Sequence, residues 1–212
     1  MRQKLIAFFV FILMVETFFI VAPDIVSADQ EGNYTYTISN GAAIITKYTG
    51  AGGAITIPST LGGYQTVAIG DAAFYNIFSL TSVTIPNSVT TIGNSAFSGC
   101  SSLTFFTIGN SVTTIGNFSF YVCSSLTSLI IGSNITTIGS HAFFRCSSLT
   151  SLIIPENVTT IGNYAFRYCS SLTSVIIGAS VNTIESYAFA DCSSLTSIIF
   201  HGLVAPTSVE LN

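Results

Sequence analysis

The chain has 212 residues, of which 49% are hydrophobic and only 7% are charged, and its formal net charge at neutral pH is −4. Ordinary soluble domains carry about 25% charged residues. In this protein, Ser, Thr and Asn must therefore make up most of the polar surface. A nucleic-acid-binding protein needs a positive patch that displaces counterions from phosphates, and the acidic balance of this chain excludes that class.

The N-terminal segment, residues 1–28, has the pattern of a secretory signal peptide. Arg2 and Lys4 precede an apolar run from Leu5 to Val15, and Val26-Ser27-Ala28 is a small-residue cleavage site. Glu16 interrupts the run, which is therefore shorter than the roughly 20 apolar residues that span a bilayer. An uncleaved membrane anchor is the alternative. We expect the mature chain to be secreted or held at the cell surface.

The segment from residue 29 to residue 69 is predicted to be an N-terminal cap with a first coil. Its spacing differs from that of the rest of the chain, because the interval from Ile57 to Ile69 is longer than the equivalent interval from Ile85 to Ile92. A cap that shields the first coil explains this longer unit.

Residues 70–200 form a repeat in which the same residue types recur at every 23rd position. The five cysteines follow this step: Cys100, Cys123, Cys146, Cys169 and Cys192. So does a column of leucines: Leu80, Leu103, Leu126, Leu149, Leu172 and Leu195. A column of phenylalanines keeps the same register: Phe74, Phe97, Phe120, Phe143, Phe166 and Phe189. Such a period indicates a solenoid, in which each coil buries its apolar residues against its neighbours.

Within one unit, Val83-Thr84-Ile85 alternates with period two and predicts a short strand that Pro86 ends. Gly93 turns the chain, and Ala96-Phe97 is predicted to lie in a short helical turn on the opposite side. Stacked coils would place equivalent strands side by side at a spacing of about 4.8 Å. The predicted fold is a β-rich, α/β horseshoe-like repeat solenoid, with a parallel sheet on its concave face and short helical turns on its convex face.

The motif L-x-x-V/L/I-x-I-P/G, followed by V-x-x-I-G-x-x-A-F-x-x-C-x-x-L, resembles the BspA-like, or Treponema-type, leucine-rich repeats and covers about residues 54–200. The segments from Tyr34 to Gly41 and from Ile55 to Pro58 are similar to the N-terminal hairpin and first coil of that family. The resemblance implies a secreted or surface protein that adheres to other cells, to matrix or to partner proteins.

The cysteines admit two interpretations. Disulfide pairing would leave one of the five over, and identical positions in neighbouring coils have parallel Cβ vectors that give poor disulfide torsion. We therefore expect buried free thiols that fill a slot in the core, with disulfides as the alternative. No unit carries Cys and His at the spacing of a metal site, and neither a metal nor another cofactor is predicted.

His141 and His201 are the only histidines. His141 stands beside the Ala-Phe turn and is expected on the convex surface, and His201 follows the last strand. Neither has a carboxylate and a nucleophile at the spacing of a catalytic motif, and no pair of acidic residues indicates a glycosidase. We predict no catalytic residues and a protein that is not an enzyme. A site assembled across coils is the alternative.

One row of residues on the sheet face is a candidate binding site. The residue between two inward positions of each strand should point outward, and this row reads Thr84, Thr107, Ile130, Ile153, Ile176 and Ile199. Phe105 lies in a neighbouring row that is otherwise Ser. Contiguous exposed apolar surface marks interaction sites, although Ile also favours strands without any partner. The predicted partner-binding residues, the sheet-face stripe, are Phe105, Ile130, Ile153, Ile176 and Ile199.

A second aromatic-rich face is predicted on the convex side. It comprises Phe118, Tyr121, Phe144, Tyr164, Tyr168 and Tyr187. Aromatic residues rimmed by polar groups suit protein or glycan partners. The alternative is that these rings pack over the turns.

Residues 201–212 are predicted to form a C-terminal cap or tail. The strand from Ser197 to Phe200 has no following repeat, and such an edge invites pairing with another chain. We expect the tail to fold back over Leu195 and Phe200. Its apolar residues are Leu203, Val204, Val209 and Leu211.

These features predict a secreted or cell-surface module that recognises or adheres to a protein or glycan, on another cell or in the matrix, through its sheet face. The alternative is a structural protein of the cell surface that self-associates. No nucleic-acid partner is expected, and no membrane span is expected after the signal peptide is removed.

Overall fold

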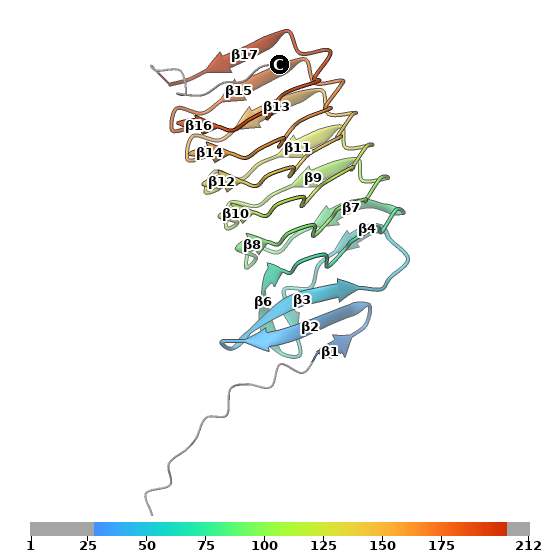
Figure 1. The fold of residues 1–212 in the computed structure, drawn as a ribbon. Coiled ribbons are helices and arrows are strands. Elements are labelled where there is room, and N and C mark those ends of the chain that lie inside the picture. Colours follow the sequence, from blue (N-terminus) through green and yellow to red (C-terminus); the bar gives the residue numbers. More distant parts are fainter. Residues whose placement is uncertain (1–27, 203–212) are drawn as a thin grey trace, which may run out of the picture.

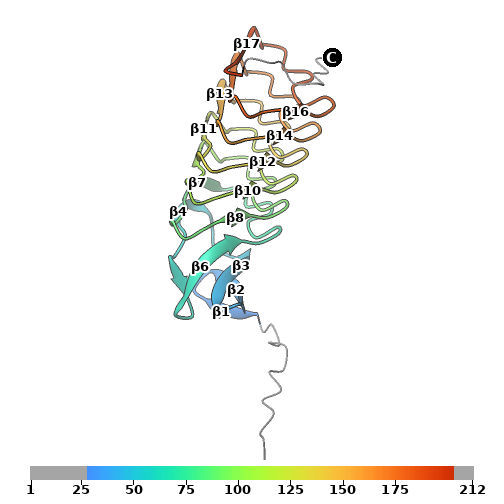
Figure 2. The same cartoon turned by 90° about the vertical axis from the view of Figure 1, so that its left-hand side faces the viewer.

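The computed structural model describes residues 28–202 (Figure 1). The predicted signal peptide of residues 1–28 lies outside the described residues apart from Ala28, and the predicted cap of residues 201–212 lies outside them apart from His201 and Gly202. The described chain is a stack of coils that follows an N-terminal hairpin (Figures 1 and 2).

The stack begins with three antiparallel strands. They are β1 (Asp29–Glu31), β2 (Tyr34–Ser39) and β3 (Ala42–Tyr48). Asn40 and Gly41 join β2 to β3 with φ angles of 51° and 73°, as a two-residue hairpin turn requires. Strand β3 then runs parallel to β6 (Tyr64–Ile69), so the hairpin covers the first coil.

Each coil contributes one strand to a parallel array that we call the long-strand ladder. Its strands are β4 (Gly53–Thr56), β7 (Leu80–Thr84), β9 (Phe105–Thr107), β11 (Ser128–Ile130), β13 (Ser151–Ile154), β15 (Ser174–Ile177) and β17 (Ser197–Phe200). The register advances by one repeat per coil, so that Phe105 pairs with Ser128 and Ser174 pairs with Ser197. The predicted solenoid of parallel strands is confirmed.

A second array, the short-strand ladder, runs along another side of the stack (Figure 2). After β6 it contains β8 (Thr91–Ile92), β10 (Thr114–Ile115), β12 (Thr137–Ile138), β14 (Thr160–Ile161) and β16 (Thr183–Ile184), and β5 (Thr60–Leu61) pairs with β6 beside it. In each short strand the Ile is buried and the Thr is at least partly exposed. These strands were not predicted from the sequence, because two residues are too few to display an alternation.

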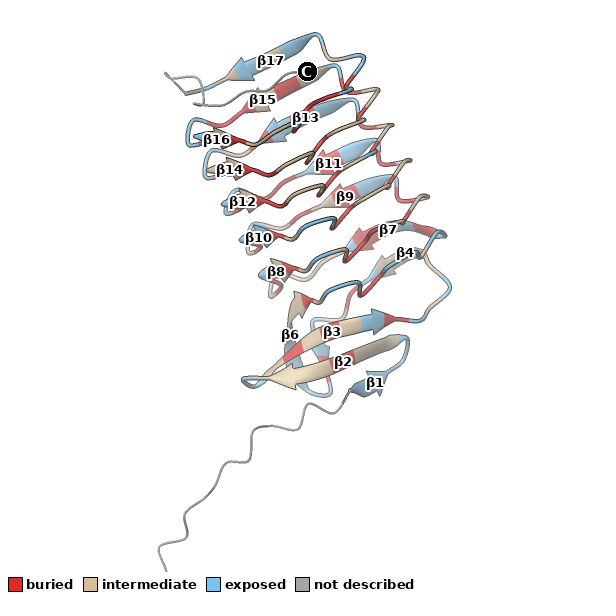
Figure 3. Cartoon of the chain, viewed as in Figure 1, coloured by how far each residue is buried: buried red, intermediate tan, exposed pale blue. Residues whose placement is uncertain are grey.

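The core consists of columns of identical or similar apolar residues that run along the stack, between the exposed outer surfaces (Figure 3). The largest is the phenylalanine column from Phe74 to Phe189, which Tyr48 of the hairpin extends at one end. Successive ring centroids in this column are 4.9–5.3 Å apart. No coil can cover its own ring faces, so the stability of each coil depends on its neighbours.

The five cysteines are free and buried, which confirms the predicted thiols. Each Sγ donates a hydrogen bond, 3.1–3.3 Å long, to the carbonyl oxygen of the phenylalanine 26 residues earlier. Burial raises the pKa of the Cys100 and Cys146 thiols to about 12. These two side chains therefore remain protonated at neutral pH and act as small apolar groups.

The predicted helical turns are wrong, because the structure contains no helix between residues 28 and 202. The turns instead bend through two left-handed positions in each coil. One column of positive φ angles is Ala72, Ser95, Phe118, His141, Tyr164 and Tyr187, and the other is Asn76, Gly99, Val122, Arg145, Tyr168 and Asp191. The N–H of Phe97 donates to the carbonyl of Ser119 in the next coil at 2.7 Å. Such bonds between coils replace the bond to the residue four positions earlier that an α-helix needs.

The long-strand ladder is interrupted between β11 and β13. Strands β4 to β11 form one sheet and β13 to β17 another, and in the described chain no backbone hydrogen bond joins the two. In the next coil Gly178 donates its N–H to the carbonyl of Ile154 at 3.0 Å. The residue equivalent to Gly178, facing the carbonyl of Ile131, is Pro155, which has no N–H to donate. Proline therefore removes one ladder bond at the place where the sheet divides.

Candidate binding surfaces

The sheet-face stripe lies on the outer side of the long-strand ladder. The side chains of Ile153, Ile130 and Ile199 are 63%, 52% and 51% exposed. Ile176 is half-buried, and Phe105 is exposed. Alternation along each strand produces this placement, because the residues before and after each of these isoleucines point into the core.

The register brings the four isoleucines together. Ile153 pairs with Ile176, and Ile176 pairs with Ile199, in the sheet formed by β13, β15 and β17. Across the interruption of the ladder, Ile130 and Ile153 line one hollow of about 230 Å³ together with Leu129, Ile131 and Ser151. The apolar row therefore continues over a gap that the backbone hydrogen bonds do not bridge.

Phe105 is separated from the isoleucines. It lines a different hollow of about 220 Å³, whose other residues include Thr84, Thr107 and Asn87. The outward row still carries Thr in these coils, at Thr84 and Thr107. Phe105 was predicted to lie in one group with the isoleucines, and the structure places it at the edge of that group.

A second candidate surface lies on the turns, and we call it the turn-face cluster. It consists of Phe118, Tyr121, His141, Phe144, Arg145, Tyr164, Arg167, Tyr168 and Tyr187. Most of these side chains are half-buried. Several have left-handed backbones, which cost about 1–3 kcal/mol each in a residue other than glycine, so the bonds between coils must hold them in place.

The rings of the turn-face cluster stack from coil to coil. Phe118 and His141 have centroids 4.6 Å apart, His141 and Tyr164 4.7 Å, and Tyr164 and Tyr187 5.3 Å. This packing covers the ring faces, so solvent meets mainly the ring edges. The predicted alternative, in which the rings pack over the turns, therefore describes much of this surface.

His141 is a packed member of this stack. Its Nδ1 is buried without a hydrogen-bond partner in the described chain. Burial, together with the positive charge of Arg167, lowers the pKa of His141 below its ordinary value. The ring is therefore uncharged at neutral pH, which favours its stacking between Phe118 and Tyr164.

The two arginines of the turn-face cluster were not among the predicted site residues. Arg167 forms an ion pair with Asp191 at 2.7 Å and donates to the Tyr168 hydroxyl at 3.1 Å. Arg145 lies with its guanidinium carbon 5.2 Å from the centroid of the Tyr168 ring. The repeat could have predicted that Arg145 lies next to Tyr168, because the two residues are one repeat apart and occupy the same position in adjacent coils.

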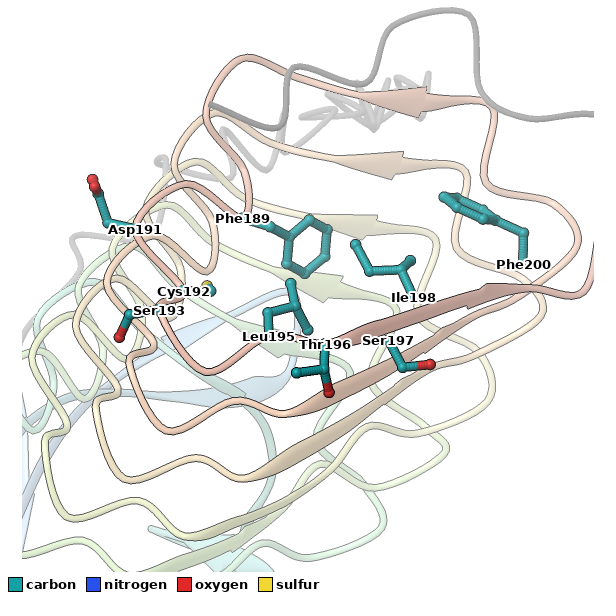
Figure 4. A pocket seen from close by; sticks show the side chains of 9 residues that line it. All are labelled: Phe189, Asp191, Cys192, Ser193, Leu195, Thr196, Ser197, Ile198 and Phe200. Carbon is teal, nitrogen blue, oxygen red and sulfur yellow. The ribbon is translucent and has the colours of Figure 1, made fainter.

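A third hollow, of about 600 Å³, lies at the last described coil (Figure 4). Phe189, Leu195 and Ile198 point into it, and Phe200 of β17 borders it. The tail that is predicted to cover this end lies outside the described residues. Glu156 fixes His201 at the start of that tail through a contact of 2.8 Å between Oε1 and Nδ1.

No group of three or more His, Cys, Asp or Glu side chains that could hold a metal ion occurs within residues 28–202. The same part of the chain contains no helix long and apolar enough to cross a membrane.

Comparisons with known proteins agree with the repeat and the fold. The profile of the BspA type leucine rich repeat region matches residues 67–200 with six copies. A leucine rich repeat protein of T. pallidum is 31% identical, with a TM-score of 0.78 and 82% of each chain covered. A leucine rich cell surface protein of Faecalibacterium prausnitzii is 33% identical, with a TM-score of 0.66, and the match covers 86% of this chain and 56% of that one.

A leucine-rich repeat protein of Bacteroides ovatus is 27% identical, with a TM-score of 0.64 and coverage of 81% of this chain and 53% of that chain. The search of curated proteins found no match. The repeat profile nevertheless covers more than half of the sequence, in the register that the leucine, phenylalanine and cysteine columns define. The chain therefore belongs to the family of BspA-type leucine-rich repeat proteins.

Proposed function

We propose that this protein is a secreted or cell-surface recognition module that binds a protein or glycan partner through the four isoleucines of the sheet-face stripe. The observation that carries the proposal is the continuous apolar row over β11, β13, β15 and β17, in which three of four side chains are more than half exposed. A contiguous apolar row facing water favours association. A partner that covers the row would remove it from water.

An extracellular location is supported by two observations. Residues 1–28 have the pattern of a signal peptide, and the F. prausnitzii relative is described as a cell surface protein. Adhesion to another cell or to matrix is the role that such a location offers to a binding module.

Binding rather than catalysis is proposed because several of the groups that could carry proton or nucleophile chemistry are occupied by packing. Burial keeps the thiols of Cys100 and Cys146 protonated, and a thiol must lose its proton to act as a nucleophile. The His141 ring is stacked between two aromatic side chains. Hydroxyls of the Thr rows, such as Thr127, bond to the backbone of the preceding coil.

The double substitution Ile130→Thr and Ile153→Thr tests the proposal. Thr occupies the same row at positions 84 and 107, so the variant should fold. We expect its affinity for a bound partner to fall by at least about tenfold, because burying one isoleucine side chain contributes about 1.5–3 kcal/mol. Biolayer interferometry against purified matrix proteins, mucin and glycans measures the effect on each partner that the wild-type protein binds.

The matched control is Phe78→Ser. Phe78 is 60% exposed and lies outside the stripe, and the equivalent residues in the next coils are Ser101 and Ser124. This variant also removes an exposed apolar side chain and restores the common residue of its column, so it should bind as the wild type does. Unchanged binding by a folded double variant would contradict the proposal and move the binding site to another face.

A further inference from the structure

The few cations of this acidic protein are unevenly placed. Between residues 28 and 202 the basic residues other than histidine are Lys47, Arg145 and Arg167. Lys47 lies in the hairpin, whereas both arginines lie in the turn-face cluster, one coil apart. The turns of the central coils therefore carry most of the positive charge of the described chain.

Arg145 differs from Arg167 in its partners. The guanidinium of Arg167 is paired with the carboxylate of Asp191 at 2.7 Å. Arg145 is exposed and forms no ion pair with any carboxylate of the described chain. Its guanidinium carbon lies 5.6 Å from the centroid of Phe144 and 5.2 Å from that of Tyr168. The rings hold the cation in position and leave its hydrogen-bond donors available to another molecule.

The surroundings of Arg145 also favour an anion. The rings of Tyr121 and Phe144 stack with centroids 5.0 Å apart and planes 8° apart, so that each covers one face of the other. The guanidinium carbons of Arg145 and Arg167 lie 5.2 Å and 4.6 Å from the centroid of the Tyr168 ring. A sugar ring would need free aromatic faces on which to stack, whereas a carboxylate needs only the hydrogen-bond donors of the Arg145 guanidinium. An acidic polypeptide therefore suits this surface better than a glycan.

The backbone beneath the surface is fixed. Arg145 and Tyr168 have φ angles of 58° and 61°. The N–H of Arg145 donates to the carbonyl of Arg167 at 2.9 Å, and the N–H of Tyr168 donates to the carbonyl of Ala190 at 3.1 Å. The side chains are thus presented from a position that the neighbouring coils define, which lowers the ordering cost of binding.

We propose that Arg145, whose guanidinium lies over the rings of Phe144 and Tyr168, is a docking site for an acidic segment of a protein partner. A Glu or Asp carboxylate of the partner accepts hydrogen bonds from the Arg145 guanidinium. This site lies on the turns and is separate from the sheet-face stripe, so its failure would leave the proposed function of the stripe intact.

The experiment uses fluorescein-labelled poly-L-glutamate as the probe and fluorescence anisotropy as the measurement. Arg145→Ala should weaken binding by about tenfold, because a charge-assisted hydrogen bond to a carboxylate is lost. Lys47→Ala is the matched control, since it removes the same charge from the hairpin, and it should bind as the wild type does. Added salt should weaken binding of the wild-type protein, because the site is exposed to solvent.

A second variant predicts a gain. Asp191→Asn removes the carboxylate that occupies Arg167 and should strengthen binding, and Asn tolerates the φ angle of 58° at this position. Asp29→Asn in the hairpin controls for the change in net charge and should have no effect. The proposal is overturned if the wild-type protein does not bind the probe, or if Arg145→Ala and Lys47→Ala act equally. It is also overturned if polygalacturonate binds more tightly than poly-L-glutamate through Arg145, which would assign the site to an acidic glycan.

Discussion

Replacing Phe143 with Ala is expected to lower the free energy of unfolding by about 3–5 kcal/mol, the usual cost of removing a buried phenylalanine ring. Phe143 is fully buried, and its ring lies between those of Phe120 and Phe166, with centroids 5.1 Å away on both sides. The substitution opens a cavity in the middle of the column. It removes contacts to two coils at once, because neither neighbouring ring can move into the space without leaving its own partner.

Urea unfolding followed by circular dichroism measures this loss. Phe78→Ser is again the control, because that ring is 60% exposed and a surface substitution changes stability by only about 0.5 kcal/mol. A loss below about 1 kcal/mol for Phe143→Ala would be inconsistent with a stack whose coils depend on one another through this column.

Gly139→Ala is expected to have the second-largest effect, a loss of about 1–3 kcal/mol from overpacking. A Cβ at residue 139 would lie 2.6 Å from the carbonyl carbon of Gly116 and 2.7 Å from the backbone nitrogen of Asn117. Both atoms belong to the backbone of the preceding coil. They can move away only if the spacing between the two coils increases.

Gly109→Ala is the matched control for this substitution. Gly109 lies in the same repeat array, its φ angle is not in the left-handed region, and a Cβ there would meet no atom within 4 Å. The substitution should be neutral or stabilise the fold by about 0.4–1 kcal/mol through the unfolded state. Thermal unfolding of the two variants compares them directly. Equal effects would mean that coil spacing does not constrain residue 139.

The sequence predicts the stacked coils well because the pattern of buried side chains repeats at a fixed interval along the chain. The columns of Leu, Phe and Cys keep one fixed step along the chain, and each position in a column has the same surroundings in every coil. Burial of the five thiols follows from the same argument. A fixed repeat of residue types in the sequence is therefore sufficient to predict that the buried core repeats from coil to coil.

The turns were predicted wrongly for a physical reason. Positions with a left-handed backbone are normally occupied by Gly or Asn. Here Phe118, Tyr164 and Tyr187 occupy such positions, with φ angles of 58° to 59°. Nothing in the local propensity of these residues indicates that conformation. It arises from hydrogen bonds to the next coil, which exist only after the coils have stacked.

The placement of the candidate binding surfaces was predicted in part. Strand alternation was sufficient to identify the outward row of Ile130, Ile153, Ile176 and Ile199. The interruption beside Ile153 was not foreseen, because the effect of Pro155 depends on which N–H groups the ladder uses. That Arg145 forms no ion pair depends on the positions of side chains in three coils. The sequence of a single repeat does not contain this information.

The sheet-face stripe is proposed to bind another molecule rather than a second copy of the chain, and the molar mass of residues 29–212 in solution tests this most directly. Multi-angle light scattering over a wide range of concentrations should find a monomer throughout, because a net charge of −4 on each copy opposes self-association. Oligomers that grow with concentration, and that disappear in the Ile130→Thr and Ile153→Thr double variant, would contradict the proposal and show that the stripe joins copies of this chain.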